Sequence, residues 1–391
     1  MEVSKFVVPA SAGVRSSGFS RSLTHKGIAA QACDNIGSEI MIHRSARKSP
    51  LAFAIASAVV LGFLMSGATA QAQRLQVCCS VPDLASLVQT VGGENVSVTT
   101  FAKGTEDPHF IEAKPSFVKA LSQANLLVVL GLGMEDGWSP VVLQNSRNAA
   151  VAIGAPGYLD ASRAIEPLDK PTGVVDRSMG DIHIGGNPHY LLDPVCGMAV
   201  ARLIRDKLGQ LAPSQKAQFD ERCDAFCQKT AEMLVGEQLA AKYKYEDILK
   251  LCRLFEQGRL QPFKEEKRLG GWLAAMLPYY GATAVDDHNM WPYFARRFGI
   301  RVIAHMEPKP GVPPTTQHLS DVAQLMRAQH AKLILANPYY DVRHSQFLAS
   351  NAGARVVGVA HQVGSRPAAI DYLSMVDYNV QQLVAALRAT Q

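Results

Sequence analysis

The feature that most constrains the fold of this chain is an alternation of short apolar runs and longer amphipathic stretches beyond residue 74. Short apolar runs bounded by turn residues are typical of buried strands, and longer stretches with helical spacing are typical of helices. This alternation predicts an α/β fold in which helices cover parallel sheets. The expected strands are Leu75–Ser80, Val96–Thr100, Leu126–Leu130, Thr283–Val285, Arg301–Ala304, Lys332–Ala336 and Arg355–Val359, and the apolar run Val151–Gly154 continues the series.

The helical stretches divide the chain into two lobes. Those between the strands are Asp83–Val91, Ser116–Ala124, Pro194–Leu208, Trp291–Phe298, Thr315–Gln329 and Ile370–Arg388. After Pro213, the sequence has no glycine or proline up to about Lys242 except Gly236. Because proline suits a first helical turn, one long helix that begins near Pro213 is predicted there. A charged helical stretch, Tyr245–Arg268, follows. We therefore expect an N-terminal lobe over 73–212, a linking helix over 213–242, and a C-terminal lobe with a helical insertion over 243–391.

Residues 1–72 have the features of a secretory signal. Arg44, Arg47 and Lys48 precede an uncharged run from Leu51 to Met65, and small-residue cleavage sites end at Ala70 and Ala72. The run is shorter than the roughly 20 residues that span a bilayer, which favours cleavage over an uncleaved anchor. No Cys follows the run at a cleavage position, so a lipid anchor is not expected. Met41 is an alternative start, and the mature protein is expected to be periplasmic.

The charge of the chain gives no support for nucleic-acid binding. The chain has 39 Lys/Arg and 34 Asp/Glu residues, and its first 70 residues hold seven of the basic and three of the acidic ones. The rest of the chain therefore has 32 basic against 31 acidic residues. Binding to phosphates requires a clustered basic surface, and the mature part is near neutral.

Six cysteines follow the signal, and they favour a structural role over a metal site. They are Cys78, Cys79, Cys196, Cys223, Cys227 and Cys252. Cys223 and Cys227 share a helical face, but no second pair completes a metal site. A structural disulfide or buried thiols are the expected alternatives.

Three of the eleven histidines stand in loops that follow predicted strands. His109 lies in a turn-rich segment before a helix, His189 follows Asn187 and Pro188 before another helix, and His288 stands where a strand ends and a helix begins. Ligands of open α/β sheets bind at the carboxyl ends of the strands, so these imidazoles are candidate metal ligands. Imidazole suits zinc and its neighbours, whereas calcium and magnesium prefer oxygen. The fourth ligand is His361, Asp341 or a water, and His361 is favoured because it also follows a strand.

Five segments resemble the zinc and manganese solute-binding proteins of bacterial ABC importers. In chain order they are Gly104–Ser116, Gly186–Pro194, His288–Gly299, Glu307–Pro314 and Asp371–Asn379. The resemblance implies two lobes joined by a long helix that limits hinge motion, with the ion in the cleft between the lobes. It also implies that His109 and His189 come from the first lobe and His288 from the second. Because many zinc binders have His where manganese binders often have Glu, His288 favours zinc, with manganese as the alternative.

The sequence departs from this family in three places. The usual late Asp is replaced near Ala360, where His361 stands; the His-rich loop is absent, with only Asp181 and His183 nearby; and Gly236–Leu277 is longer than the usual connection. These departures put the fourth ligand and the metal preference in question.

The resemblance implies a monomeric, non-enzymatic receptor that captures the ion and docks on an inner-membrane permease. A zinc hydrolase with three histidines and an activated water is one alternative, because Glu106 and Asp107 adjoin His109. A periplasmic zinc chaperone or store is another. The remaining histidines with ordinary surroundings, His305, His318, His330 and His344, are expected to be structural.

Overall fold

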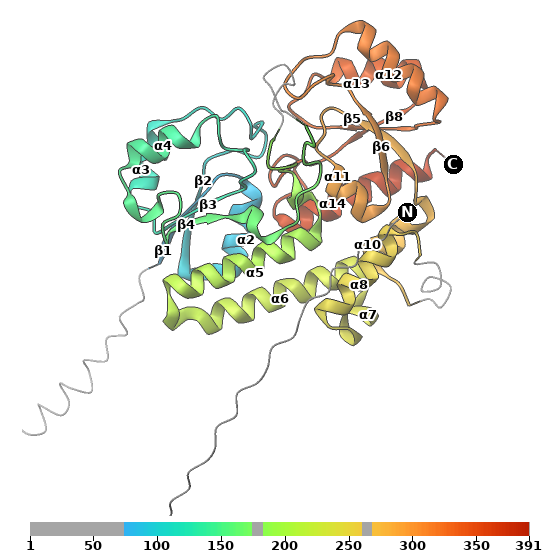
Figure 1. The fold of residues 1–391 in the computed structure, drawn as a ribbon. Coiled ribbons are helices and arrows are strands. Elements are labelled where there is room, and N and C mark those ends of the chain that lie inside the picture. The colour runs from blue at the N-terminus through green and yellow to red at the C-terminus, as the bar shows by residue number, and fades with distance from the viewer. Residues whose placement is uncertain (1–73, 174–182, 260–267, 391) are drawn as a thin grey trace, which may run out of the picture. The chain divides into compact units, whose positions relative to one another are not determined.

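A computed structural model describes residues 74–173, 183–259 and 268–390 of the chain. The signal segment, Met41 and Asp181 lie outside these ranges. The described part contains two lobes, each built on a four-stranded parallel sheet (Figure 1). The predicted α/β fold with two parallel-sheet lobes is confirmed. Within the described residues, no helix combines the length and apolar character needed to cross a membrane.

The first sheet has the strand order β2-β1-β3-β4. Its strands are β1 (Leu75–Cys79), β2 (Val96–Thr100), β3 (Leu126–Val129) and β4 (Tyr158–Asp160). Every residue of β3 is buried, as expected for a parallel sheet covered on both faces. The first three strands match the sequence prediction closely. The run Val151–Gly154 is not a strand: a 3₁₀ turn, Ala149–Val151, occupies its start, and β4 pairs with β3 further along.

The second sheet repeats this arrangement with the order β6-β5-β7-β8. Its strands are β5 (Thr283–Asp286), β6 (Arg301–His305), β7 (Leu333–Ala336) and β8 (Arg355–Gly358). All pairs are parallel, and the register between β5 and β6 shifts after Ala284. Loops at the carboxyl ends of these strands carry the candidate site.

The helices around the two sheets begin mostly at prolines or polar caps. They are α2 (Pro82–Gly92), α3 (Pro115–Ser122), α4 (Ser139–Ser146), α5 (Pro194–Leu211), α6 (Lys216–Val235), α7 (Glu237–Lys242), α8 (Tyr245–Glu256), α10 (Gly271–Met276), α11 (Pro292–Phe298), α12 (Thr316–Ala328), α13 (Val342–Ala352) and α14 (Tyr372–Arg388). Proline suits the first helical turn because its missing N–H has no helical partner there. Asp193 caps α5 by accepting from the N–H of Val195, and Asp371 forms a capping box with Ser374 at α14.

The long helix expected over 213–242 is interrupted at Gly236. α6 ends at Val235, and Gly236 adopts a φ of 88° before α7 begins. A Cβ at this position would meet the Cα of Gly270 at 2.7 Å, so both backbone conformation and packing require glycine. The expected helix Tyr245–Arg268 is likewise shorter, because α8 ends at Glu256.

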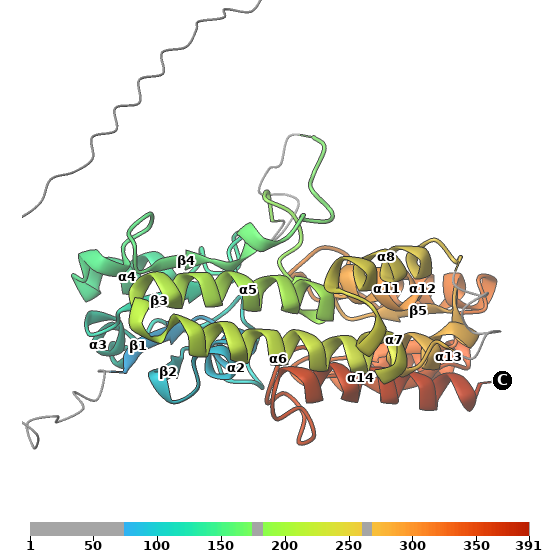
Figure 2. The ribbon, with the colours of Figure 1, turned by 90° about the horizontal axis from the view of Figure 1, so that it is seen from below.

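A hydrophobic core extends through both lobes by way of the central helices. α5 and α6 pack along each other, and α6 also contacts α2 and α10 (Figure 2). The C-terminal helix α14 contacts α10 and β8 and returns to contact α2 of the first lobe. All six cysteines in the described part of the chain are buried free thiols, so the alternative of buried thiols holds there.

Polar contacts also join the two lobes. The guanidinium of Arg297 on α11 donates to both carboxylate oxygens of Asp193, at 2.8 and 2.9 Å. The Tyr372 hydroxyl donates to the carbonyl of Leu191 at 2.8 Å, and the Tyr293 hydroxyl donates to that of Asn187 at 2.8 Å. These contacts hold the loop around His189 against the second lobe.

Candidate metal centre

The three histidines singled out from the sequence lie at the carboxyl ends of the sheets. His109 stands in the loop between β2 and α3, and His189 lies between β4 and α5. His288 lies between β5 and α11. His109 and His189 therefore belong to the first lobe and His288 to the second. All three lie at the carboxyl ends of the strands, where ligands of open α/β sheets bind.

His109 is oriented by Asp107. One carboxylate oxygen of Asp107 lies 2.7 Å from His109 Nδ1 and 3.0 Å from its backbone nitrogen. Burial alone raises the pKa of the Asp107 carboxyl, but the hydrogen bond and the charge of His109 outweigh this, and the pKa is lowered. An ionised carboxylate only accepts, so Nδ1 carries the proton and the lone pair is at Nε2. This carboxylate–imidazole pairing is common behind metal-bound histidine.

His288 has the same arrangement in the second lobe. Its Nδ1 lies 3.0 Å from the Glu307 carboxylate, which also accepts from the backbone N–H of Gly311. The His288 side chain is buried. Donation from Nδ1 to the carboxylate leaves the lone pair of this ring at Nε2 as well.

His189 is buried, and its Nε2 has no hydrogen-bond partner in the described part of the chain. Its backbone N–H donates to the side-chain oxygen of Asn187 at 3.0 Å, which fixes the turn before the short 3₁₀ helix Tyr190–Leu192. Burial lowers the pKa of His189 well below its usual value, and the neighbouring imidazoles add to this. The ring is therefore neutral at neutral pH, as coordination requires.

The three imidazoles converge on one point. The ring centroids lie 5.2 Å apart for His109 and His189, 5.4 Å for His109 and His288, and 5.6 Å for His189 and His288. One nitrogen of each ring lies within 4.8 Å of the others. Nitrogens bound to tetrahedral zinc at about 2.0–2.1 Å lie about 3.3–3.4 Å apart, a separation that falls inside this limit.

The other two protein candidates for a fourth ligand are not in this group. His361 is buried, with Nε2 3.3 Å from the carbonyl oxygen of Glu106, while its Nδ1 has no partner among the described residues. Asp341 caps α13 by accepting from the N–H of Arg343, whose guanidinium also pairs with it. The structure therefore gives the Asp341 carboxylate a capping role.

The sequence did not reveal the contacts of His183, Asp107 and Glu307: Asp107 was considered only as a base for the hydrolase alternative, and His183 only as a residue near the absent His-rich loop. His183 Nε2 lies 3.2 Å from His109 Nε2, so a fourth imidazole adjoins the cluster. The signals for it in the sequence were its position shortly before His189 and its place near where the family usually has a His-rich loop. Asp107 is two residues from His109 and pairs with it locally, whereas Glu307, in one of the family-like segments, reaches His288 across 19 residues and pairs with it only through the tertiary structure.

Two histidines expected to be structural make contacts that fit that reading. His305 Nδ1 lies 2.5 Å from the buried carboxylate of Asp286. His318 Nε2 lies 3.1 Å from the carbonyl oxygen of His305, so the ring donates to the backbone.

We expect the apoprotein to reveal the buried state of His361 through the pH dependence of its stability. Burial lowers the pKa of His361 to about 4, although the Glu106 carbonyl opposes the shift. Between pH 6.5 and 4 the unfolded chain binds a proton that native His361 does not, so this ring reduces stability as the pH falls. As the pH falls from 6.5 to 4, the free energy of unfolding of His361→Gln should rise by up to about 3 kcal/mol relative to that of the wild type.

Urea denaturation of both proteins at several pH values measures this difference. Other titrating groups cancel in the comparison, and above pH 7 the difference should be constant. A difference independent of pH down to 4 would contradict the buried neutral state of His361.

Two parallel-sheet lobes with a cluster of imidazoles at their carboxyl edges define the class of the protein: a bilobed solute-binding protein for metal ions. The chain belongs to the family described as "Zinc-uptake complex component A periplasmic", whose model matches residues 77–241 and 265–386. It is thus a metal-binding protein of ABC metal transport, in a family of substrate-binding proteins rather than of enzymes.

Known relatives are distant but cover most of the chain. A manganese-binding lipoprotein MntA from Halalkalibacterium halodurans is 21% identical over 325 residues, which is 82% of this chain and 91% of the relative. The high-affinity zinc uptake system protein ZnuA of Yersinia pestis is 22% identical over 60% of this chain and 66% of its own length.

Solved structures support the fold. A crystal structure of ZnuA matches with a TM-score of 0.58 and 20% identity, over 80% of this chain and 99% of that one. The structure of FpvC from Pseudomonas aeruginosa in complex with Mn²⁺ matches with a TM-score of 0.59 and 19% identity, over 82% and 100%.

Proposed function

We propose that this protein captures one zinc ion through His109, His189 and His288 and delivers it to the permease of an ABC importer. The observation that carries this proposal is the convergence of three imidazoles from two lobes within 4.8 Å. The carboxylates of Asp107 and Glu307 fix the protons of two of these rings on Nδ1, so both rings aim a lone pair from Nε2. Such a site is prepared for a cation before the cation arrives.

Zinc is favoured over manganese by the chemistry of the donors. Neutral imidazole nitrogen suits zinc, whereas manganese prefers carboxylate, carbonyl and water oxygen. Carboxylates are close by, but Asp107 and Glu307 are engaged by ring N–H groups. Manganese remains the alternative cargo, since some relatives are described as manganese-binding.

The test is metal binding by the mature protein after it has been stripped with a chelator. Titration calorimetry should give one zinc per chain and a much lower affinity for manganese. Replacing all three histidines with alanine should abolish this binding while circular dichroism stays unchanged. Wild-type affinity in the triple variant would overturn the proposal.

Delivery to a permease is supported by the family, whose members are components of metal uptake complexes. We expect the protein to act as a monomer. Cells that lack the gene should accumulate less zinc in chelator-treated medium, and the triple variant should not restore uptake. Normal zinc uptake without the gene would count against the transport role and favour a chaperone or store.

Export to the periplasm is part of the same proposal. We expect the signal segment to be cleaved, so that the mature protein begins at Gln71 or Gln73. N-terminal sequencing of protein from the periplasmic fraction tests this. An intact N-terminus in the membrane fraction would indicate an uncleaved anchor instead.

The hydrolase alternative is less well supported. A zinc hydrolase requires a carboxylate free to act as a base on the metal-bound water. Asp107 is bonded to His109, and Glu106 accepts from the backbone N–H of Lys103 and lies within 4.0 Å of two lysine ammonium groups. We therefore propose a binding protein and not an enzyme.

A further inference from the structure

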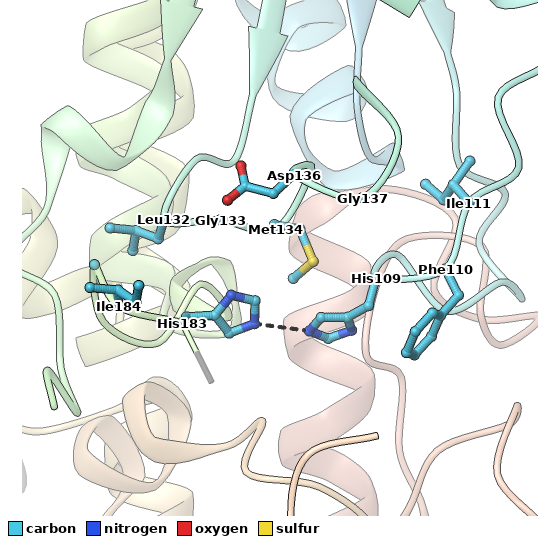
Figure 3. Close-up of a pocket in the computed structure, with 11 residues that line it drawn as sticks. His109, Phe110, Ile111, Leu132, Gly133, Met134, Asp136, Gly137, His183 and Ile184 are labelled. Carbon is cyan, nitrogen blue, oxygen red and sulfur yellow. Dashed lines mark hydrogen bonds between the residues drawn. The ribbon is translucent and has the colours of Figure 1, made fainter. Parts of the chain in front are cut away.

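A fourth imidazole faces the cluster from the segment that precedes His189. His183 and His109 point toward each other at the edge of a cavity of about 660 Å³, which Leu132, Met134 and Asp136 also line (Figure 3). Their Nε2 atoms are 3.2 Å apart, and their ring centroids are 5.2 Å apart with an angle of 30° between the planes.

Both rings also make hydrogen bonds outside their mutual contact. Asp107 fixes the proton of His109 on Nδ1, as described above. A hydrogen bond links the His183 ring to the backbone of Leu132, and His183 Nδ1 lies 3.3 Å from where a Cβ of Gly133 would stand. The two Nε2 atoms are close enough for one ring to donate to the other, and a cation between them would replace that hydrogen bond by binding both Nε2 lone pairs.

The distance fits a shared metal ion. Two nitrogens bound to tetrahedral zinc at about 2.0–2.1 Å are separated by about 3.3–3.4 Å. The observed distance of 3.2 Å between His183 Nε2 and His109 Nε2 is close to this separation. From this geometry we infer that His183 is the fourth zinc ligand and completes a site of four imidazoles. The inference rests on the proposed function, because it adds a ligand to the same ion.

The other candidates have competing contacts. His361 donates from Nε2 to the Glu106 carbonyl, so only its Nδ1 is free, and the ring packs edge-on against Tyr339 with centroids 4.7 Å apart. Asp341 is bound by Arg343 at the start of α13. None of the three candidates, His183 included, has a ligand atom within 4.8 Å of all three rings of the cluster of His109, His189 and His288. His183 has a ring nitrogen in contact with one of its members.

An all-imidazole site has a consequence for selectivity. Four neutral nitrogens provide no oxygen donor from the protein, so the site discriminates strongly against manganese. Placing a carboxylate at position 183 would introduce an oxygen donor. His183→Asp should therefore narrow the ratio of zinc to manganese affinity, an effect that a purely structural role of His183 would not produce.

The experiment compares His183→Ala, His183→Asp and the matched control His361→Ala in the mature protein. Zinc affinity is measured by competition with a chelator, and the bound-metal geometry from the visible spectrum of the cobalt-substituted protein. We expect His183→Ala to weaken zinc binding roughly 100- to 1000-fold and to alter the cobalt spectrum. His361→Ala should leave the cobalt spectrum unchanged.

Three results separate this inference from the proposed function. If His183→Ala keeps the wild-type affinity and cobalt spectrum, His183 is not a ligand, although the three-histidine site stands. If His361→Ala alters the cobalt spectrum and His183→Ala does not, His361 is the fourth ligand and the inference is overturned. If wild-type protein binds no zinc, the proposed function itself fails.

Discussion

Replacing His189 with alanine is expected to weaken zinc binding by roughly 100- to 1000-fold. Zinc sites with four ligands are worth about 10–16 kcal/mol in total, so one ligand contributes about 2.5–4 kcal/mol, and each 1.4 kcal/mol is a factor of ten. His189 is a strong choice for this test because its Nε2 is buried and has no competing hydrogen-bond partner in the described part of the chain. The measurement is competition with a chelator at pH 7.5.

The matched control is His318→Ala. His318 lies on α12 and donates to the backbone carbonyl of His305, so its loss should leave zinc affinity unchanged. Equal affinities for His189→Ala and wild type would contradict the proposed site. Thermal unfolding of both apoproteins would show that any loss of affinity is not a loss of folding.

The second large effect is expected at the ion pair that joins the lobes. Arg297→Met should destabilise the apoprotein by about 3–5 kcal/mol, because it leaves the Asp193 carboxylate buried without its charged partner. Asp193 is fully buried and Arg297 nearly so, and two hydrogen bonds link them. Arg297 Nη1 also lies 2.6 Å from Glu256, so the variant removes a second charge contact.

A double-mutant cycle isolates this interaction. Asp193→Asn keeps an oxygen that can cap α5, and the double variant should be less destabilised than the sum of the two single changes. Lys216→Met, which removes an exposed pair with Asp220 on α6, should cost about 0.5 kcal/mol or less. Chemical denaturation measures all four variants. A loss for Arg297→Met as small as that for Lys216→Met would show that the pair does not stabilise the fold.

The structure accounts for where sequence reasoning on the fold failed. Strands such as Val96–Thr100 were predicted to the residue because a short apolar run carries its own signal. The strand predicted at Val151–Gly154 was wrong because Val151 ends a 3₁₀ helix and the next three residues form a bend and a turn. The fourth strand, β4, has three residues and is defined by its pairing with β3. The interruption of the linking helix depends on the approach of Gly270 to Gly236, a contact between distant parts of the chain.

The sequence by itself determined the α/β class, the two lobes and the positions of His109, His189 and His288 in loops after strands. These features are local, since periodicity sets a strand or helix and the end of a strand sets the edge that a loop occupies. Only the tertiary structure decided which side chains meet. His183 approaches His109 across 74 residues, and His361 meets Glu106 across 255. The partners of the ring N–H groups determine which nitrogen is free to bind an ion. Asp107 pairs with His109 from two residues away, a local contact, whereas Glu307 reaches His288 across 19 residues, and that pairing follows from packing.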